Sequence, residues 1–351
     1  MIKKLISFFI ILSLSVIRVS AFDPGSVSAE CAVVMNVHTG EVIFAKNEHQ
    51  KQSMASTTKI MTSLLAIESG ELQSEIVVSE HMLGVEGTSM GLLAGDSVSL
   101  DELVYGMMLS SGNDAAEVAA IHIGGNIENF SILMNQKAQQ IGMLNTNFVT
   151  PSGLDDENHY STAYDMALLG SYAVKNPKFA SVCSLKKATV SYGNPPYLRT
   201  LYNHNKLLDY YDFALGIKTG FTKKSGRCLV SYAVKDNAEL IAVTLNAPDD
   251  WNDHIRMFDY AFGTLVSGNC TPDIHKNIKV VGGKKDSVSI SAEPCKYSVS
   301  DENIEVTTKV YIEQFIYAPV KKDMVVGKCE YYIQGKLFKV VPILTCESID
   351  I

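Results

Sequence analysis

The spacing of hydrophobic and polar positions divides the chain into two parts. From about residue 30 to 265, segments with helical spacing of apolar residues are interleaved with short apolar runs typical of antiparallel strands. The predicted helices lie near residues 56–69, 100–109, 114–120, 130–141, 161–172 and 254–262. The predicted strands lie within residues 31–45, 76–78, 215–221, 228–234 and 240–245. Because strands and helices do not alternate strictly, this pattern predicts an α+β fold.

The pattern changes after Thr271-Pro272. Four runs alternate apolar and polar residues, near 278–283, 287–290, 304–311 and 331–338, and none shows helical spacing. A chain of 351 residues also exceeds what one hydrophobic core usually supports. The sequence therefore predicts two domains, residues 22–272 and 273–351, the second a small all-β domain of the sandwich type.

The first 21 residues have the composition of a secretory signal. Two lysines precede an apolar run from Leu5 to Ile17, and Val19-Ser20-Ala21 supplies small residues for cleavage. The run is short for a membrane span, which needs about 20 apolar residues. We expect cleavage after Ala21 and an exported mature protein; an uncleaved N-terminal anchor is the alternative, because Arg18 is unusual at such a site.

Charge and cysteine content exclude some classes of function. The net charge of −8 argues against nucleic-acid binding, which requires a basic surface. The seven cysteines include no C-x-x-C pair, so a metal knuckle is not expected. An odd number leaves at least one free thiol, while Cys295, Cys329 and Cys346 could provide one bridge within the second domain.

Three short motifs carry candidate chemistry. They are Ser56-x-x-Lys59, Ser111-Gly-Asn113 and Lys218-Thr-Gly220. A serine hydroxyl needs a base within hydrogen-bond reach to act as a nucleophile, and residues three apart share one face of a helix. Each motif alone is common by chance. In this order they match the S-x-x-K, S-D-N and K-T-G signature of class A β-lactamases and penicillin-binding proteins, except that Gly112 stands where S-D-N has an acid.

Longer stretches around these motifs resemble a particular family. Residues 55–62, 106–116, 153–162 and 216–222 are similar to those of low-molecular-mass penicillin-binding proteins of the D-alanyl-D-alanine carboxypeptidase family. The resemblance covers about residues 28–265. It implies a transpeptidase fold of the penicillin-binding-protein and β-lactamase type, with no metal and no organic cofactor. It also implies peptidoglycan pentapeptides as substrates and β-lactam antibiotics as acylating ligands.

The residue chemistry and the resemblance agree on the catalytic roles. Ser56 is expected to attack the carbonyl of the penultimate D-alanine and form an acyl-enzyme. Lys59 is expected to take the serine proton, since a desolvated lysine near other cations can be neutral at pH 7. The Ser111 hydroxyl can relay that proton to the leaving nitrogen. Water then hydrolyses the acyl-enzyme.

Five further residues are predicted to bind the substrate. Asn113 offers an amide to the substrate backbone, while Lys218 and Thr219 attract its terminal carboxylate. Gly220 lets the substrate approach the strand closely. The backbone N–H of Phe221, by resemblance, joins that of Ser56 in the oxyanion hole. His159 is interpreted as a structural anchor, and Asp249-Asp250 as solvated turn acids.

Alternative functions remain open at this stage. A β-lactamase would need a glutamate that directs water, and Glu157 lies in the corresponding loop. A slow penicillin-accepting sensor, or endopeptidase action on cross-links, fits the same motifs. Residues 340–351 lack the amphipathic basic helix with which many family members associate with the membrane surface, so release or N-terminal tethering is expected.

Overall fold

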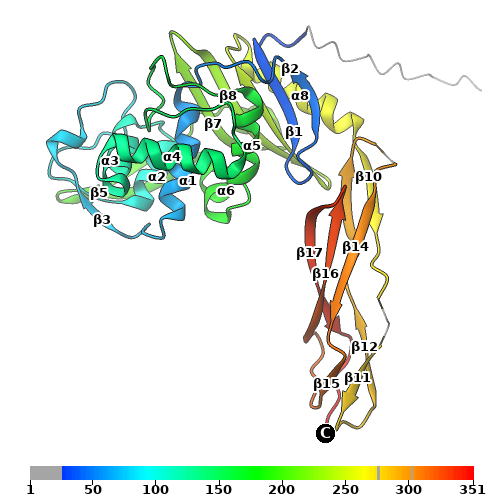
Figure 1. The fold of residues 1–351 in the computed structure, drawn as a ribbon. Helices are drawn as coiled ribbons and strands as arrows, with labels where there is room; N and C mark the ends of the chain where they lie inside the picture. Colours follow the sequence, from blue (N-terminus) through cyan, green and yellow to red (C-terminus); the bar gives the residue numbers. More distant parts are fainter. Residues whose placement is uncertain (1–25, 275–276, 302) are drawn as a thin grey trace, which may run out of the picture.

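The computed structural model describes residues 26–274, 277–301 and 303–351, so the predicted signal peptide lies outside the described residues. Figure 1 shows a body of mixed helices and strands from which a long, narrow all-β part extends, with the C-terminus at its far end. The predicted α+β class with an all-β C-terminal part is confirmed. In the described segments, no helix combines the length and the apolar character needed to cross a membrane.

A five-stranded antiparallel sheet organises the body. Its strand order is β2-β1-β9-β8-β7. The strands are β1 (Cys31–Asn36), β2 (Val42–Lys46), β7 (Ala214–Thr222), β8 (Gly226–Lys235) and β9 (Ala238–Leu245). The strands predicted within residues 31–45 form a hairpin, and those predicted at 215–221, 228–234 and 240–245 form an antiparallel meander. The meander places the Lys218-Thr-Gly220 strand, β7, at an edge of the sheet.

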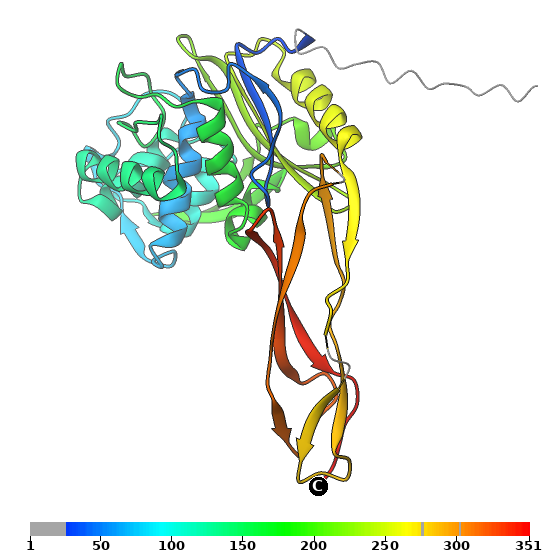
Figure 2. The same ribbon diagram turned by 45° about the vertical axis from the view of Figure 1, so that its right-hand side comes forward.

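Both faces of this sheet are covered. All six residues of β1 are buried, and the five apolar ones alternate between two hydrophobic clusters. Val33 and Met35 pack with α1 (Lys59–Glu68) and α5 (Ala163–Ala173) on one face. Successive strand residues point to opposite faces, so Ala32 and Val34 pack instead against α8 (Asp250–Thr264). Figure 2 shows α8 on the side of the sheet opposite the main group of helices.

Further helices form a lobe beside the sheet. They are α2 (Leu100–Met108), α3 (Asn113–Gly124), α4 (Ile127–Ile141) and α6 (Pro177–Cys183). The short α7 (Leu207–Tyr210) instead contributes Leu207 to the hydrophobic cluster on the α8 side. The helix predicted near residues 161–172 begins slightly later, because α5 starts at Ala163. Thr162 is the N-cap of α5, and its hydroxyl accepts from Asp165 N at 3.0 Å. The Ser161 hydroxyl instead contacts that of Thr146, which explains why the neighbouring residue begins the helix.

A second, four-stranded sheet was only partly predicted. Its order is β3 (Glu75–Val77), β4 (Ser97–Ser99), β5 (Lys187–Gly193) and β6 (Pro196–Tyr202). The segment around Pro195-Pro196, where the sequence pattern predicted no strand, forms the turn of the β5–β6 hairpin. Pro196 is the first residue of β6, and β6 is an edge strand, where a missing backbone N–H is tolerated.

The C-terminal part contains two sheets. Strand β10 (Val266–Cys270) pairs with β13 (Cys295–Val299), although it lies before the predicted boundary at residue 272. A six-stranded sheet has the order β14-β16-β17-β12-β11-β15. Its strands are β11 (Asn277–Val281), β12 (Ser287–Ser291), β14 (Val306–Ile312), β15 (Phe315–Tyr317), β16 (Val325–Ile333) and β17 (Lys336–Thr345). The run at 331–338, predicted as one strand, turns at Gln334-Gly335, where both residues have positive φ, as in a two-residue hairpin turn.

Candidate active site

Ser56 lies at the start of the helical lobe, against the edge of the main sheet. It belongs to the 3₁₀ turn η2 (Ala55–Thr58), which leads directly into α1. Side chains three residues apart eclipse one another in a 3₁₀ helix. The first residue of α1 is Lys59, and its Nζ lies 2.9 Å from Ser56 Oγ. The predicted nucleophile and base are therefore in hydrogen-bond contact.

The surroundings of Lys59 favour its neutral form. The side chain is fully buried, and Nζ donates to Asn113 Oδ1 and to Ser152 O, each at 2.7 Å. Burial lowers the pKa of Lys59 well below its ordinary value, and the nearby cation Lys218 lowers it further. A neutral amine has two N–H groups and one lone pair. With both carbonyl oxygens taking N–H donors, the lone pair is left for the hydroxyl of Ser56.

The second motif forms the wall opposite β7. Ser111 has a φ of 58° and sits immediately before α3, with its carbonyl accepting from Thr88 Oγ1 at 2.7 Å. Asn113 begins α3, and its Nδ2 donates to Glu86 O at 2.6 Å. Both ends of the Asn113 amide are thus engaged within the protein. Its predicted contact with substrate stays a prediction, and that contact would use the second N–H of Nδ2.

The third motif, Lys218-Thr-Gly220, lies on β7 where this strand packs closely against Ser56. A Cβ atom on Gly220 would lie 3.0 Å from Ser56 N and 3.1 Å from Met54 O. The glycine therefore makes room for the backbone that carries Ser56. Lys218 is 1% exposed, its Nζ donates to Thr219 O at 3.0 Å, and burial lowers its pKa to about 7.

The three motifs enclose a cleft of about 510 Å³. It is lined by Ser56, Thr88, Ser111, His204, Lys206, Thr219, Gly220, Phe221, Arg227, Asp250 and Trp251. Five of the eight predicted site residues therefore face the cleft. Lys59, Asn113 and Lys218 lie behind this surface, because each is buried by neighbouring protein groups.

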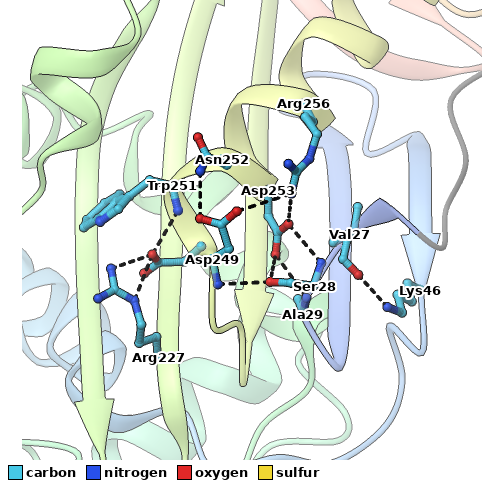
Figure 3. A network of polar contacts seen from close by, with 11 residues as sticks. Val27, Ser28, Ala29, Lys46, Arg227, Asp249, Trp251, Asn252, Asp253 and Arg256 are labelled. Carbon is cyan, nitrogen blue, oxygen red and sulfur yellow. Dashed lines mark hydrogen bonds and ion pairs between the residues drawn. The ribbon is translucent and has the colours of Figure 1, made fainter. Parts of the chain in front are cut away.

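One cleft wall was not recognised in the sequence. Arg227, opposite Phe221 in the β7–β8 ladder, donates from Nε at 2.9 Å and from Nη2 at 2.6 Å to Asp250 Oδ1. Its guanidinium also lies over the Trp251 ring, 5.4 Å from the centroid, and Figure 3 shows both side chains at the start of α8. The interpretation of Asp250 as a solvated turn acid is wrong, since this residue is 2% exposed and paired with arginine.

The loop from residue 150 to 160 supports the nucleophile from behind. His159 Nε2 lies 2.9 Å from Thr58 Oγ1, and Nδ1 accepts from Val149 N at 2.9 Å. Burial lowers the pKa of His159 to about 4, so the ring is neutral and serves as an anchor. Glu157, by contrast, is exposed and is not among the residues that line the cleft.

Within the described ranges, no group of three or more acidic, histidine or cysteine side chains is placed to hold a metal ion. The arrangement instead supplies a serine nucleophile, a lysine base and a cationic wall. Such a set can form and hydrolyse an acyl-enzyme without a metal ligand set.

Comparisons with known proteins agree with this geometry. A family model described as D-alanyl-D-alanine carboxypeptidase matches residues 18–249, and one described as penicillin-binding protein 5, C-terminal domain, matches residues 265–350. The D-alanyl-D-alanine carboxypeptidase DacF of Bacillus subtilis is 31% identical over 91% of this chain and 85% of its own length. DacA of Haemophilus influenzae is 31% identical, over 92% of this chain and 87% of its own length.

Solved structures extend the similarity to the fold. Penicillin-binding protein 5 from Haemophilus influenzae has a TM-score of 0.66 at 29% identity, covering 94% of this chain and 100% of that one. The Streptomyces K15 DD-transpeptidase has a TM-score of 0.65 at 28% identity, and covers 68% of this chain and 98% of that one. The first of these spans both parts of the molecule.

Proposed function

The chain belongs to the serine D-alanyl-D-alanine carboxypeptidase family, and from this premise we propose that Ser56 is the nucleophile that removes the terminal D-alanine from peptidoglycan stem peptides. The observation that carries the proposal is the 2.9 Å contact between Ser56 Oγ and the buried amine of Lys59. It gives the weak serine nucleophile the adjacent base that it needs.

The reaction proceeds in two halves. Ser56 Oγ attacks the carbonyl carbon of the penultimate D-alanine while Lys59 Nζ takes the hydroxyl proton. The C–N bond then breaks, the proton reaches the leaving nitrogen through the Ser111 hydroxyl, and free D-alanine departs. Water attacks the ester carbonyl in the second half and releases the shortened peptide, which restores the Ser56 hydroxyl.

The cleft walls offer groups that can bind two negative charges, the oxyanion that forms during attack and the terminal carboxylate of the substrate. The backbone N–H of Ser56 faces Gly220, next to Phe221, which supports the predicted oxyanion hole formed by the N–H groups of Ser56 and Phe221. For the terminal carboxylate, Thr219 and Arg227 line the cleft, whereas Lys218 is enclosed. Lys206 and Arg227 are the lysine and arginine that line the cleft. We assign the carboxylate to Arg227, because Asp250 holds its guanidinium on the strand next to β7, and Lys218 acts mainly on Lys59 through its charge.

The partners and the location follow from the chemistry. The pentapeptide stem and β-lactam antibiotics both present a reactive carbonyl near a carboxylate, so both fit this cleft. A site that acts on peptidoglycan belongs outside the cytoplasm, in agreement with the signal predicted in residues 1–21. In this proposal the mature protein is either tethered by its N-terminal segment or released into the cell envelope.

The test compares the chain with its Ser56→Ala variant. Each is incubated with a peptide that ends in D-Ala-D-Ala and with a fluorescent penicillin. We expect D-alanine release and stable labelling from the unaltered chain, and neither from the variant. Labelling without release supports the sensor alternative, and rapid turnover of penicillin supports a β-lactamase. If folded protein gives neither, the assignment of Ser56 fails.

A further inference from the structure

Three of the seven cysteines lie together where the two parts of the molecule join. Cys270 and Cys295 are directly opposite each other at the end of the antiparallel β10–β13 pair. Cys329, from β16 of the other sheet, packs in the same cluster, together with Tyr331 and Val341. Cys346, which the sequence suggested as a partner, is exposed and donates to Ser291 Oγ at 3.4 Å instead.

Three cysteines offer three pairings, and the strand register distinguishes between them. Opposite residues of an antiparallel pair have Cα atoms about 4.5–5.5 Å apart, within the range of about 4.4–6.8 Å that a disulfide requires. Cys329 packs against this pair from the other sheet, where its ladder neighbours are Val310 and Val341, so no strand register places it opposite Cys270 or Cys295. The Cys270–Cys295 pair is therefore the one whose strand register matches the spacing that a disulfide requires.

We propose that Cys270 and Cys295 are a site of disulfide formation, and that the bond links the connecting strand β10 covalently to the C-terminal part. All the described cysteines are free thiols in this structure, which is the reduced state of the site. Cys270 is partly exposed, while Cys295 is 1% exposed. The more accessible Cys270 is consequently the first to meet an oxidant.

The chemistry needs a low-molecular-weight disulfide as the oxidant. The Cys270 thiolate attacks one sulfur of this disulfide, forming a mixed disulfide and releasing one thiol. The Cys295 thiolate then attacks Cys270 Sγ, which forms the protein disulfide and releases the second thiol. Two protein thiols are oxidised, one reagent disulfide is reduced, and two protons pass from the cysteines to the released thiols.

The position of the bond gives it a structural consequence. Strand β10 follows α8 almost directly, and Cys270 is its last residue. The partner strand β13 also touches the body, since Asn36 Nδ2 donates to Ser298 O at 3.1 Å. A bond between Cys270 and Cys295 would close the chain between them into a loop and raise the temperature at which the C-terminal part unfolds.

The test oxidises the full chain with oxidised glutathione and maps disulfides by mass spectrometry. We expect one linked pair of peptides containing Cys270 and Cys295, loss of two free thiols, and a rise of several degrees in the unfolding temperature. Cys346→Ser, as the matched control, should leave this linked pair unchanged. Cys295→Ser should abolish it while keeping penicillin labelling, which shows that the protein is folded.

Other outcomes would overturn the proposal. These are glutathione retained on Cys270 without a bond to Cys295, a bond from Cys329 to Cys270 or Cys295 as the main product, or seven unreacted thiols in folded protein. None of these outcomes affects the assignment of Ser56, because no described cysteine lines the cleft.

Discussion

Lys59 Nζ lies 2.9 Å from Ser56 Oγ and 2.7 Å from Asn113 Oδ1, so one buried amine joins the nucleophile to the second catalytic motif. The two N–H groups of the neutral amine have carbonyl-type acceptors in Asn113 and Ser152. This arrangement fixes the direction of the lone pair before any substrate enters. The serine is thereby prepared for attack in the free enzyme.

Replacement of Lys59 by Met should therefore remove the base while leaving a side chain of similar length. General-base catalysis contributes about 10²–10⁴-fold, so acylation by a fluorescent penicillin should slow by about that factor. Stopped-flow labelling measures this rate. Lys137→Met, which removes a surface pair with Glu68, should label at the normal rate. Equal labelling by the Lys59 variant would exclude Lys59 as the base.

The pH dependence of acylation should report the charge of Lys218. Below about pH 7 this buried lysine becomes charged, and its repulsion lowers the pKa of Lys59. Lys218→Met removes the repulsion, so Lys59 binds its proton at a higher pH. The acid limb of the acylation profile should move to higher pH, whatever happens to the maximal rate. An unmoved limb, in a variant that still labels, would show that Lys218 does not influence the base.

The catalytic pair could be predicted because it depends on local geometry. Ser56 and Lys59 are three residues apart at a helix start, and this spacing alone brings them together. The order of the three motifs then indicated which distant segments must meet. Both ends of α2 and the start of α3 were also predicted within one residue, since apolar spacing and the Ser111-Gly-Asn113 turn mark them.

The cleft wall formed by Arg227, Asp250 and Trp251 could not be predicted, because it depends on the pairing register of β7 with β8 and on where α8 begins. Arg227 and Asp250 are 23 positions apart, and they meet only when β8 pairs with β7 and α8 starts beside that hairpin. A pair of aspartates before a helix is usually an exposed cap in sequence. Burial of Asp250 is a tertiary property, which the local pattern does not contain.

Arg227→Met should impair substrate binding more than bond breaking. A charge-assisted contact to a carboxylate is worth about 1.5–3 kcal/mol, so the KM for a D-Ala-D-Ala peptide should rise by about 10–100-fold. With a peptide whose C-terminus is amidated, the variant and the unaltered enzyme should have the same KM. Steady-state kinetics on both peptides measures this, and an equal loss on both would remove Arg227 from carboxylate recognition.

The matched control for Arg227 is Arg256, which pairs with the next buried aspartate of α8. Its Nη2 donates to Asp253 Oδ1 at 2.6 Å, and the same carboxylate accepts from the backbone of Ser28 and Ala29. Figure 3 shows this pair beside the N-terminal segment rather than beside Trp251. Arg256→Met should lower the free energy of unfolding while leaving KM unchanged.

Gly220→Ala tests how closely β7 must approach the nucleophile. The added Cβ would lie 3.0 Å from Ser56 N and 3.1 Å from the Ala55 Cβ, so the backbone around Ser56 must shift. We expect a loss of about 1–3 kcal/mol in stability, together with a larger proportional loss of penicillin labelling. Gly263→Ala, whose Cβ meets nothing within 4 Å, should keep full labelling. Normal labelling by Gly220→Ala would show that this approach is not required.

The anchor of the loop at residues 150–160 should make the protein sensitive to acid. The pKa of His159 is about 4 in the folded protein, against about 6.5 when unfolded, so the unfolded chain binds more protons between these values. Stability from the neutral ring is complete above pH 6.5 and is lost as the pH falls toward 4, by about 2–3 kcal/mol at pH 4.5. His159→Gln keeps a donor and an acceptor but does not titrate, so it should lose less stability between pH 7 and pH 4.5. Urea unfolding at both values measures this difference, with His49→Gln, at an exposed position, as the control. If His159→Gln loses as much stability as the unaltered chain, protonation of this anchor does not drive the acid sensitivity.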